Sequence, residues 1–235
     1  MSHRFVAASA VVLALAGAAA ADTVNLDFVG TGAGRNVTLT LSGYNGGGSF
    51  GAFSGQLKHA FSNGNGVAAS LTGTLFTFCT EITQHVYNQS SPSSTPYTVY
   101  PLRDLPTPGA GMGPAKEQAI WDLYAFGSDM AYQLGGNNDF ASAFQVAIWE
   151  IVYDGGGSMS LTGGNLRVSG MTSQAQTYFN TLKTKIDGLA NGSGIMGLGS
   201  TDFQDQIVLI PIPSGVALGL AGLGLAAAVR LRRRA

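Results

Sequence analysis

Two segments without acidic or basic residues, one at each end of the chain, limit the part that can fold as a globular domain. The first runs from Phe5 to Ala21, directly after Arg4, and it closes in small residues before Asp22. It is shorter than the roughly 20 residues that a membrane span needs. A short basic start, an apolar centre and small residues at the end are typical of a secretory signal peptide. We therefore expect residues 1–21 to be a signal peptide.

The second segment, residues 207–229, is also free of charge and is followed by an arginine-rich tail. Two prolines near its start interrupt any helix, so we expect the apolar helix to cover residues 214–229. An apolar helix followed by arginines is oriented with those arginines in the cytoplasm. A plain inner-membrane tail anchor is one interpretation of this pattern.

The other interpretation is a sorting signal, because residues 207–235 resemble the PEP-CTERM signals of Gram-negative bacteria. Such signals combine a Pro-x-Pro motif, a short apolar helix and a terminal arginine cluster. The matching residues here are Pro211, Pro213, Arg232, Arg233 and Arg234. Ile212 stands where the family often has glutamate. The resemblance implies an exosortase-type processing enzyme as a partner, transient anchoring in the inner membrane, and delivery to the cell envelope, cell surface or extracellular matrix.

Between these ends, residues 22–206 are enough for one domain with its own core. This region holds all 13 acidic residues but seven of the 12 basic ones, which gives it a net charge of −6. An acidic domain lacks the basic surface that binds nucleic acid, so we exclude that partner. The acidic residues do not have the spacing of metal ligands. The glycine runs do not lie between a strand and a helix, as the glycines of a phosphate-binding loop do. We expect neither a metal nor a cofactor.

The pattern of hydrophobic residues predicts an α+β domain, in which strands and helices occupy separate stretches of the chain. Alternating or β-branched stretches predict strands at residues 23–29, 36–44, 67–79 and 95–105, with a last strand near 203–210. Helical periodicity predicts helices near 114–126, 138–154 and 172–188, and a hairpin near 160–170. We expect an antiparallel β-sandwich or barrel with an inserted helical subdomain.

A single cysteine and one glutamine occur in strongly apolar stretches of this domain. Cys79 ends the run LFTFC, and Gln145 lies in the helical run AFQVAIWEIVYD. One cysteine in an exported protein forms no internal disulfide. Cys79 is then a small hydrophobic residue of the core, an intermolecular thiol or a reactive group. We expect Gln145 at the margin of the helix's buried face, one residue past Phe144.

These two stretches together resemble the thioester domains of bacterial surface adhesins, in which a cysteine side chain is joined to a glutamine side chain. The family's glutamine motif is Thr-Gln-x-Ala, often followed by an aliphatic residue and Trp. The corresponding residues here are Phe144, Gln145, Val146, Ala147, Ile148 and Trp149, so that Phe144 replaces the threonine. The cysteine motif is Phe78-Cys79. The resemblance, which covers about residues 75–154, implies a Cys79–Gln145 thioester.

Such a bond makes chemical sense of the residue types. The thiol attacks the amide carbon, ammonia leaves, and the activated acyl group is then open to an amine or a hydroxyl on a surface molecule or exopolysaccharide. An aromatic shelter from Phe76, Phe78, Phe144 and Trp149 excludes water. His85 is the one nearby candidate base. Each thioester reacts only once and the protein does not turn over, so we do not expect an enzyme.

Two alternatives stay open from the sequence. The first is an exported structural or non-covalent adhesive protein, as in a biofilm matrix, in which Cys79 only fills the core. The second is a secreted hydrolase that uses Cys79 and His85, although no third orienting residue is evident.

Overall fold

The computed structural model describes residues 21–86, 95–107, 111–133, 135–157, 159–192 and 194–210. Within these ranges the chain forms a mixed α/β domain with a seven-stranded antiparallel sheet and three α-helices. The strands are β1 (Thr23–Leu41), β2 (Ser49–Ser62), β3 (Gly73–Cys79), β4 (Thr95–Pro101), β5 (Leu166–Ser169), β6 (Ile195–Gly199) and β7 (Gln206–Leu209). The helices are α1 (Gly113–Ala131), α2 (Asn138–Asp154) and α3 (Ser173–Lys183), with short 3-10 turns at Asn45–Gly47, Gly66–Ser70 and Leu102–Asp104.

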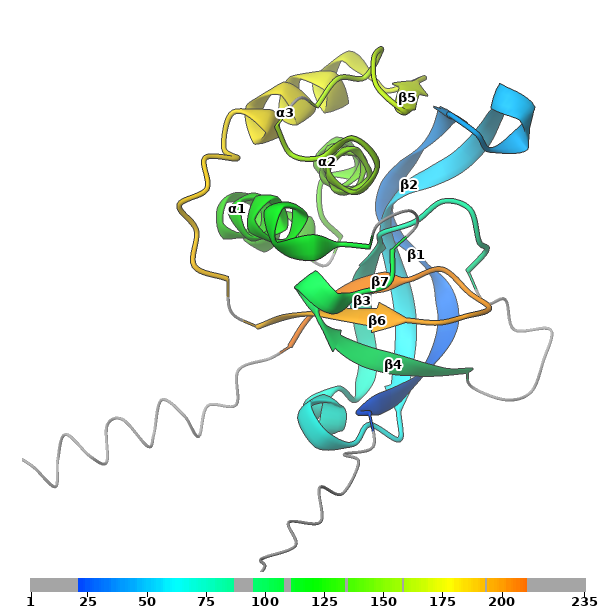
Figure 1. Ribbon diagram of the computed structural model, residues 1–235, viewed down its shortest axis with the longest axis vertical. Helices are drawn as coiled ribbons and strands as arrows, with labels where there is room; N and C mark the ends of the chain where they lie inside the picture. The colour runs from blue at the N-terminus through cyan, green and yellow to red at the C-terminus, as the bar shows by residue number, and fades with distance from the viewer. Residues whose placement is uncertain are drawn as a thin grey trace, which may run out of the picture.

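The sheet is closed on itself through its first and longest strand. The order of strands is β2-β3-β7-β6-β4-β1-β5, and β1 also pairs with β2 along most of its length. The N-terminal end of β1 pairs with β4, and its C-terminal end pairs with β5. Beyond the closed part, β1 and β2 continue as a long two-stranded hairpin (Figure 1).

The three helices form a layer on one side of the strands, and α2 is the central one (Figure 1). It packs against α1, α3 and the first three strands. Because neighbours surround it, every residue from Phe140 to Val152 is buried. Asn137 caps its N-terminus by accepting the N–H groups of Asp139 and Phe140. An ion pair between Arg35 and Asp139, with a 3.1 Å separation of Nε and Oδ1, fixes that end to β1.

The predicted α+β composition is confirmed, and several boundaries are corrected. Residues 23–41 form one strand instead of two, since glycine-containing bulges carry the chain through Gly30 to Gly34 within the sheet. The strands β2 and β6 were not predicted. The expected hairpin near 160–170 is wrong, because β5 pairs with β1. The helix predicted near 138–154 is α2, and Asn137 caps it.

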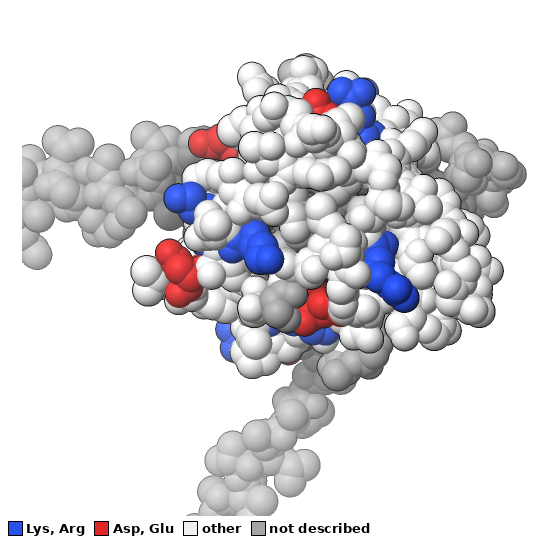
Figure 2. Space-filling model, turned by 90° about the horizontal axis from the view of Figure 1, so that it is seen from above, with Lys and Arg blue, Asp and Glu red and all other residues white. Residues whose placement is uncertain are grey.

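Charged side chains are sparse on the domain surface. On the face drawn in Figure 2, a few basic and acidic residues are scattered, and broad uncharged areas lie between them. In the part of the chain that the structure describes, no helix is both long and apolar enough to cross a membrane. The predicted signal peptide (1–21, of which Ala21 alone is described) and sorting helix (214–229) lie outside that part.

Candidate functional site

The side chain of Gln145 pairs with the main chain of Cys79. Its Nε2 donates to the carbonyl oxygen of Cys79 over 2.7 Å, and the N–H of Cys79 donates to its Oε1 over 3.1 Å. The Cys79 thiol lies 3.5 Å from the same Oε1. Residues 66 positions apart in the chain are thus in contact at the end of β3. The structure brings together the two residues that the sequence singled out.

The sheet geometry explains why a glutamine fits there. Pairing between β2 and β3 stops at Leu57 and Thr77, so Cys79 has no strand partner on that side. On its other side it is paired with Gln206 of β7. A primary amide carries one acceptor and a donor, like a peptide group. The Gln145 side chain therefore takes the place of the missing strand, and it is completely buried instead of marginal.

Several aromatic rings lie in the same hydrophobic core as Cys79. The Phe78 ring lies 5.1 Å from that of Phe144 and 5.3 Å from that of Tyr132, measured between centroids. The Tyr124 ring lies 5.1 Å from Phe144 as well. Phe78, Phe144 and Trp149 are each at most 1% exposed. Such an apolar enclosure keeps bulk water away from a reactive acyl group.

The electrostatics of the site depend mainly on this burial. Desolvation raises the pKa of the Cys79 thiol to about 12, and the charge of Glu81 adds to that effect, whereas the nearby Trp149 indole lowers it. Nε1 of Trp149 is buried and makes no hydrogen bond of ordinary geometry with the described residues. This N–H group is therefore a donor available to a sulfur or oxygen atom that gains negative charge during a reaction.

A cavity of about 210 Å³ reaches Cys79 from the surface. Its walls are largely apolar, and Trp149 closes its inner end beside the cysteine. The apolar part of the lining comprises Tyr44, Phe50, Phe53, Leu57, Ile82 and Val86. His85 lies at the exposed rim of the same cavity, and its main-chain oxygen accepts the N–H of Gln204. Cys79 and His85 thus line one cavity.

Three of the four residues expected to shelter the pair, all except Phe76, lie in the same hydrophobic core as Cys79. Phe76 lies elsewhere on β3, where its ring is 6.0 Å from Nζ of Lys58 and lines a different cavity. Sequence patterns gave no indication of Tyr153, whose hydroxyl accepts the N–H of Ile82 over 3.0 Å and so fixes the chain just after Cys79. Gln145, Trp149 and Tyr153 recur every four residues, and this spacing places them along one side of α2.

Other features of the chain do not add to this site. The sorting residues Pro211, Pro213, Arg232, Arg233 and Arg234 lie outside the described residues. Within the described ranges, no group of three or more His, Cys, Asp or Glu side chains is arranged to hold a metal ion. No protein-family model, curated protein or solved structure matches the chain.

Proposed function

We propose that this protein is an exported surface or matrix protein that attaches covalently to a partner through an internal thioester between Cys79 and Gln145. The observation that carries the proposal is the contact of the thiol with the glutamine amide at 3.5 Å inside a buried, aromatic enclosure. Holding two reactants in contact replaces a bimolecular encounter by an intramolecular step, which offsets much of an amide's resistance to attack.

The proposed step balances without a cofactor. The sulfur of Cys79 bonds to the amide carbon of Gln145, the carbon–nitrogen bond breaks, and the thiol proton leaves with the nitrogen as ammonia. The N–H of Cys79 already donates to Oε1, so it stabilises the oxyanion that develops on this atom. The Trp149 N–H assists the sulfur as it gains charge. Phe144 provides no hydroxyl where the family motif has threonine.

An acceptor then enters through the cavity at Cys79. An amine or a hydroxyl group of a surface molecule or exopolysaccharide attacks the acyl carbon, the sulfur leaves as the thiol, and the partner stays bound to Gln145 by an amide or ester. His85 at the rim of the cavity is the candidate base for a hydroxyl acceptor. Each molecule reacts once, so the protein is not an enzyme.

The ends of the chain place this chemistry outside the cytoplasm. In this proposal the domain is a strand barrel with a helical insert, carried between a signal peptide (1–21) and a PEP-CTERM-type sorting tail (207–235). The tail anchors the protein transiently in the inner membrane through residues 214–229. An exosortase-type enzyme then processes it, and the domain reaches the cell envelope, surface or matrix of a Gram-negative cell.

A second function is favoured by one specific observation. The Gln145 amide satisfies both main-chain groups of Cys79 without any covalent bond. The pair then only completes the open edge of β3, and the protein is a structural or non-covalent adhesive component of the surface or biofilm. In this case Cys79 remains a free thiol.

The intact mass of the purified protein separates these functions. Thioester formation removes ammonia, so the wild type should be about 17 Da lighter than its sequence and processing require. Cys79→Ala and Gln145→Ala variants, processed in the same way, should show only the mass change of the substitution. Methylamine should add about 31 Da to the wild type alone, because the N-methylamide that forms is about 14 Da heavier than the original glutamine amide. A wild-type mass without the ammonia loss, together with a thiol that alkylates fully in denaturant, would rule out the thioester and leave the structural function.

A further inference from the structure

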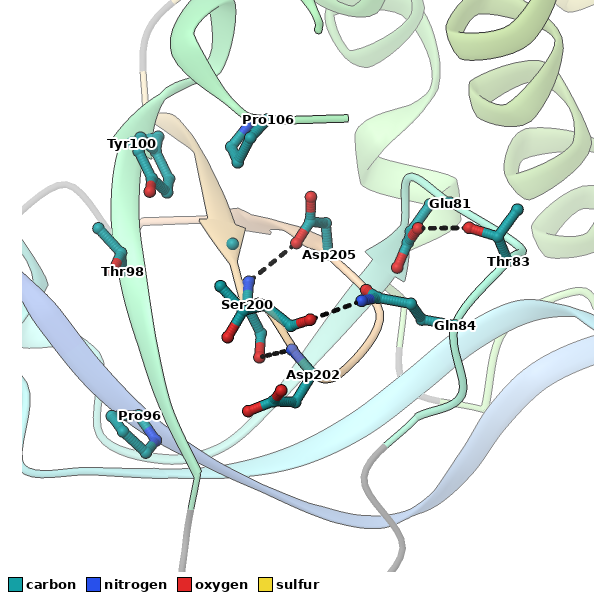
Figure 3. Close-up of a pocket in the computed structure, with 12 residues that line it drawn as sticks. Glu81, Thr83, Gln84, Pro96, Thr98, Tyr100, Pro106, Ser200, Asp202 and Asp205 are labelled. Carbon is teal, nitrogen blue, oxygen red and sulfur yellow. Dashed lines mark hydrogen bonds between the residues drawn. The ribbon is translucent and has the colours of Figure 1, made fainter. Parts of the chain in front are cut away.

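A second cavity, which Cys79 does not line, opens between the segment after β3, strand β4 and the loop that joins β6 to β7 (Figure 3). Its volume is about 620 Å³. Three carboxylates line it, from Glu81, Asp202 and Asp205, and no lysine, arginine or histidine among the described residues does so. The cavity is therefore strongly acidic for its size.

Two of these carboxylates form the buried end of the cavity. Glu81 is 4% exposed and Asp205 is 3% exposed. Oε2 of Glu81 accepts the Thr83 hydroxyl over 2.9 Å, but its Oε1 is buried and has no hydrogen-bond partner among the described residues. Figure 3 shows this carboxyl group directed into the cavity, across from Asp205. A buried carboxylate oxygen without a donor is costly, so this atom marks an unfilled requirement for a hydrogen-bond donor.

In the described part of the chain, no donor of the cavity wall is bonded to Oε1 of Glu81. The Gln84 amide donates to the main-chain oxygen of Thr201 over 2.9 Å, and the N–H of Ser200 donates to Oδ1 of Asp205 over 2.9 Å. Both groups are thus already engaged within the cavity wall. A ligand that fits has to bring N–H or O–H donors, and positive charge would complement the carboxylates.

The electrostatics agree with this geometry. Burial, together with the charge of Glu81, raises the pKa of Asp205 to about 7. Burial also raises the pKa of Glu81. Two carboxyl groups that share a desolvated site repel each other when both are ionised, and a cation placed between them removes that repulsion.

We propose that this cavity binds a primary alkylammonium group, which donates to Oε1 of Glu81 and to the carboxylate of Asp205. An ammonium suits the site better than a guanidinium, because Oε2 of Glu81 and Oδ1 of Asp205 are already engaged. Neither carboxylate therefore offers the two free oxygens that a guanidinium fork requires. The Tyr100 ring, with Pro96 and Pro106, forms an apolar wall for the alkyl chain (Figure 3).

This site extends the protein's activity beyond covalent attachment. Gln84 lines both this cavity and the one at Cys79, so the two lie on either side of the segment that follows β3. A cationic partner held reversibly in the acidic cavity is kept next to the reactive pair. The ammonium site does not depend on the thioester, because none of its groups takes part in that bond.

Binding should be measured on the Cys79→Ala protein, in which no thioester forms and an amine cannot be captured covalently. Titration calorimetry or NMR shifts with n-pentylammonium should show saturable binding, at least about tenfold tighter than with 1-pentanol, the neutral analogue. The Glu81→Gln change should weaken binding at least about tenfold, since it removes the charge but keeps the shape. Asp129→Asn, which removes an exposed acid on α1, should leave it unchanged. Nα-acetyl-lysine amide and glucosamine then distinguish a peptide source of the ammonium from a sugar source.

If Glu81→Gln does not fold, a second variant, in which a larger side chain fills the cavity, tests the proposal. Thr98→Phe, at a half-buried position of β4, fills the cavity from its wall and should abolish binding of n-pentylammonium. Equal binding of 1-pentanol, unchanged affinity in both folded variants, or complete displacement of the ammonium by an equal concentration of Ca²⁺ would each overturn the proposal. The intact-mass result for the wild type has no bearing on this outcome.

Discussion

The amide group of Gln145 occupies the position of a missing strand beside Cys79, with its nitrogen 2.7 Å from the Cys79 carbonyl oxygen and its oxygen 3.1 Å from the Cys79 nitrogen. The hydrogen bonds complete the edge of β3, and they also hold the amide next to the thiol, as the proposed thioester requires. A role in folding and a role in bond formation can be separated by substitutions that affect them differently.

Gln145→Glu tests the structural part in the Cys79→Ala background, where no thioester interferes. The carboxylate loses the donor to the carbonyl oxygen of residue 79 and places a charge in a fully buried site. We expect a loss of roughly 2–4 kcal/mol of unfolding free energy, measured by urea denaturation. Gln174→Glu, an exposed change in the first turn of α3, should cost nothing measurable. Equal stability of the two variants would show that the Gln145 hydrogen bonds are not formed.

The accessibility of Cys79 gives a second prediction. The side chain is 3% exposed and burial raises its pKa to about 12, so in Gln145→Ala the free thiol should resist iodoacetamide at pH 8 while the protein is folded. Denaturant should make it react at the rate of an ordinary cysteine. In the wild type, labelling in denaturant should require prior treatment with hydroxylamine, which cleaves a thioester. Rapid labelling of the folded variant would contradict the enclosure described for this site.

The Trp149 indole should matter more for bond formation than for folding. Trp149→Phe keeps an aromatic ring beside the sulfur but removes the only N–H group of that side chain, which lowers the thiol pKa. We expect a smaller fraction of the molecules to have lost ammonia, that is, to have formed the thioester. The free energy of unfolding should fall by about 1–2 kcal/mol. Phe179→Leu, a buried aromatic change in α3, should cost similar stability and leave the ammonia loss complete. Equal effects of both changes on the mass would assign Trp149 a packing role alone.

Apolar context singled out Cys79 and Gln145, and the resemblance to thioester domains paired them, but neither predicted the way in which Gln145 is held. The residue types and their apolar context pointed to Cys79 and Gln145, because an amide inside a hydrophobic helix is unusual. Helical periodicity describes a single buried face, so it placed Gln145 at a margin. The structure buries α2 on all sides, which depends on contacts with α1, α3 and the sheet that no local pattern contains.

The same limit applies to the strands. Residues 30–35 contain three glycines and resemble a turn, yet bulges allow β1 to continue through them. The strand β2 was missed because glycines interrupt its alternation, although its pairing with both β1 and β3 shapes the cavity at Cys79. No local pattern indicated that Glu81 would be buried. Its burial opposite Asp205 follows from the pairing of β3 with β7, which joins Cys79 to Gln206, 127 positions further along the chain.

The glycines of β2 differ in what their surroundings allow, and this difference can be tested. A Cβ atom at Gly55 would lie 2.3 Å from the main-chain oxygen of Ala33 and 2.5 Å from Cα of Gly34, so the backbone itself would have to move. We expect Gly55→Ala to cost roughly 2–3 kcal/mol of unfolding free energy. Gly51→Ala, in the same strand, meets nothing within 4 Å and should be neutral or slightly stabilising. Thermal unfolding of the two variants compares them directly, and equal melting temperatures would contradict the close pairing of β1 with β2.

The pH dependence of stability should reveal the buried carboxyl group of Glu150 on α2. Burial, with a smaller effect from Asp154, raises its pKa from an ordinary 4.5 to about 7, although Oε2 accepts the N–H of Ser160 over 2.8 Å. The folded protein holds this proton more tightly than the unfolded chain. Its contribution is therefore fully present below pH 4.5 and is lost as the pH rises through 7.

Glu150→Gln keeps the acceptor and removes the charge, so it should gain on the order of 2 kcal/mol over the wild type at pH 8 and nothing at pH 4. Asp205, whose pKa is also raised, changes the stability with pH in the same direction as Glu150. His59, whose pKa burial lowers to about 4, changes it in the opposite direction. Both residues are present in the wild type and in the variant, so their effects cancel in the difference. Urea denaturation at pH 4, 6 and 8 measures that difference, and a gain independent of pH would show that folding leaves the pKa of Glu150 unchanged.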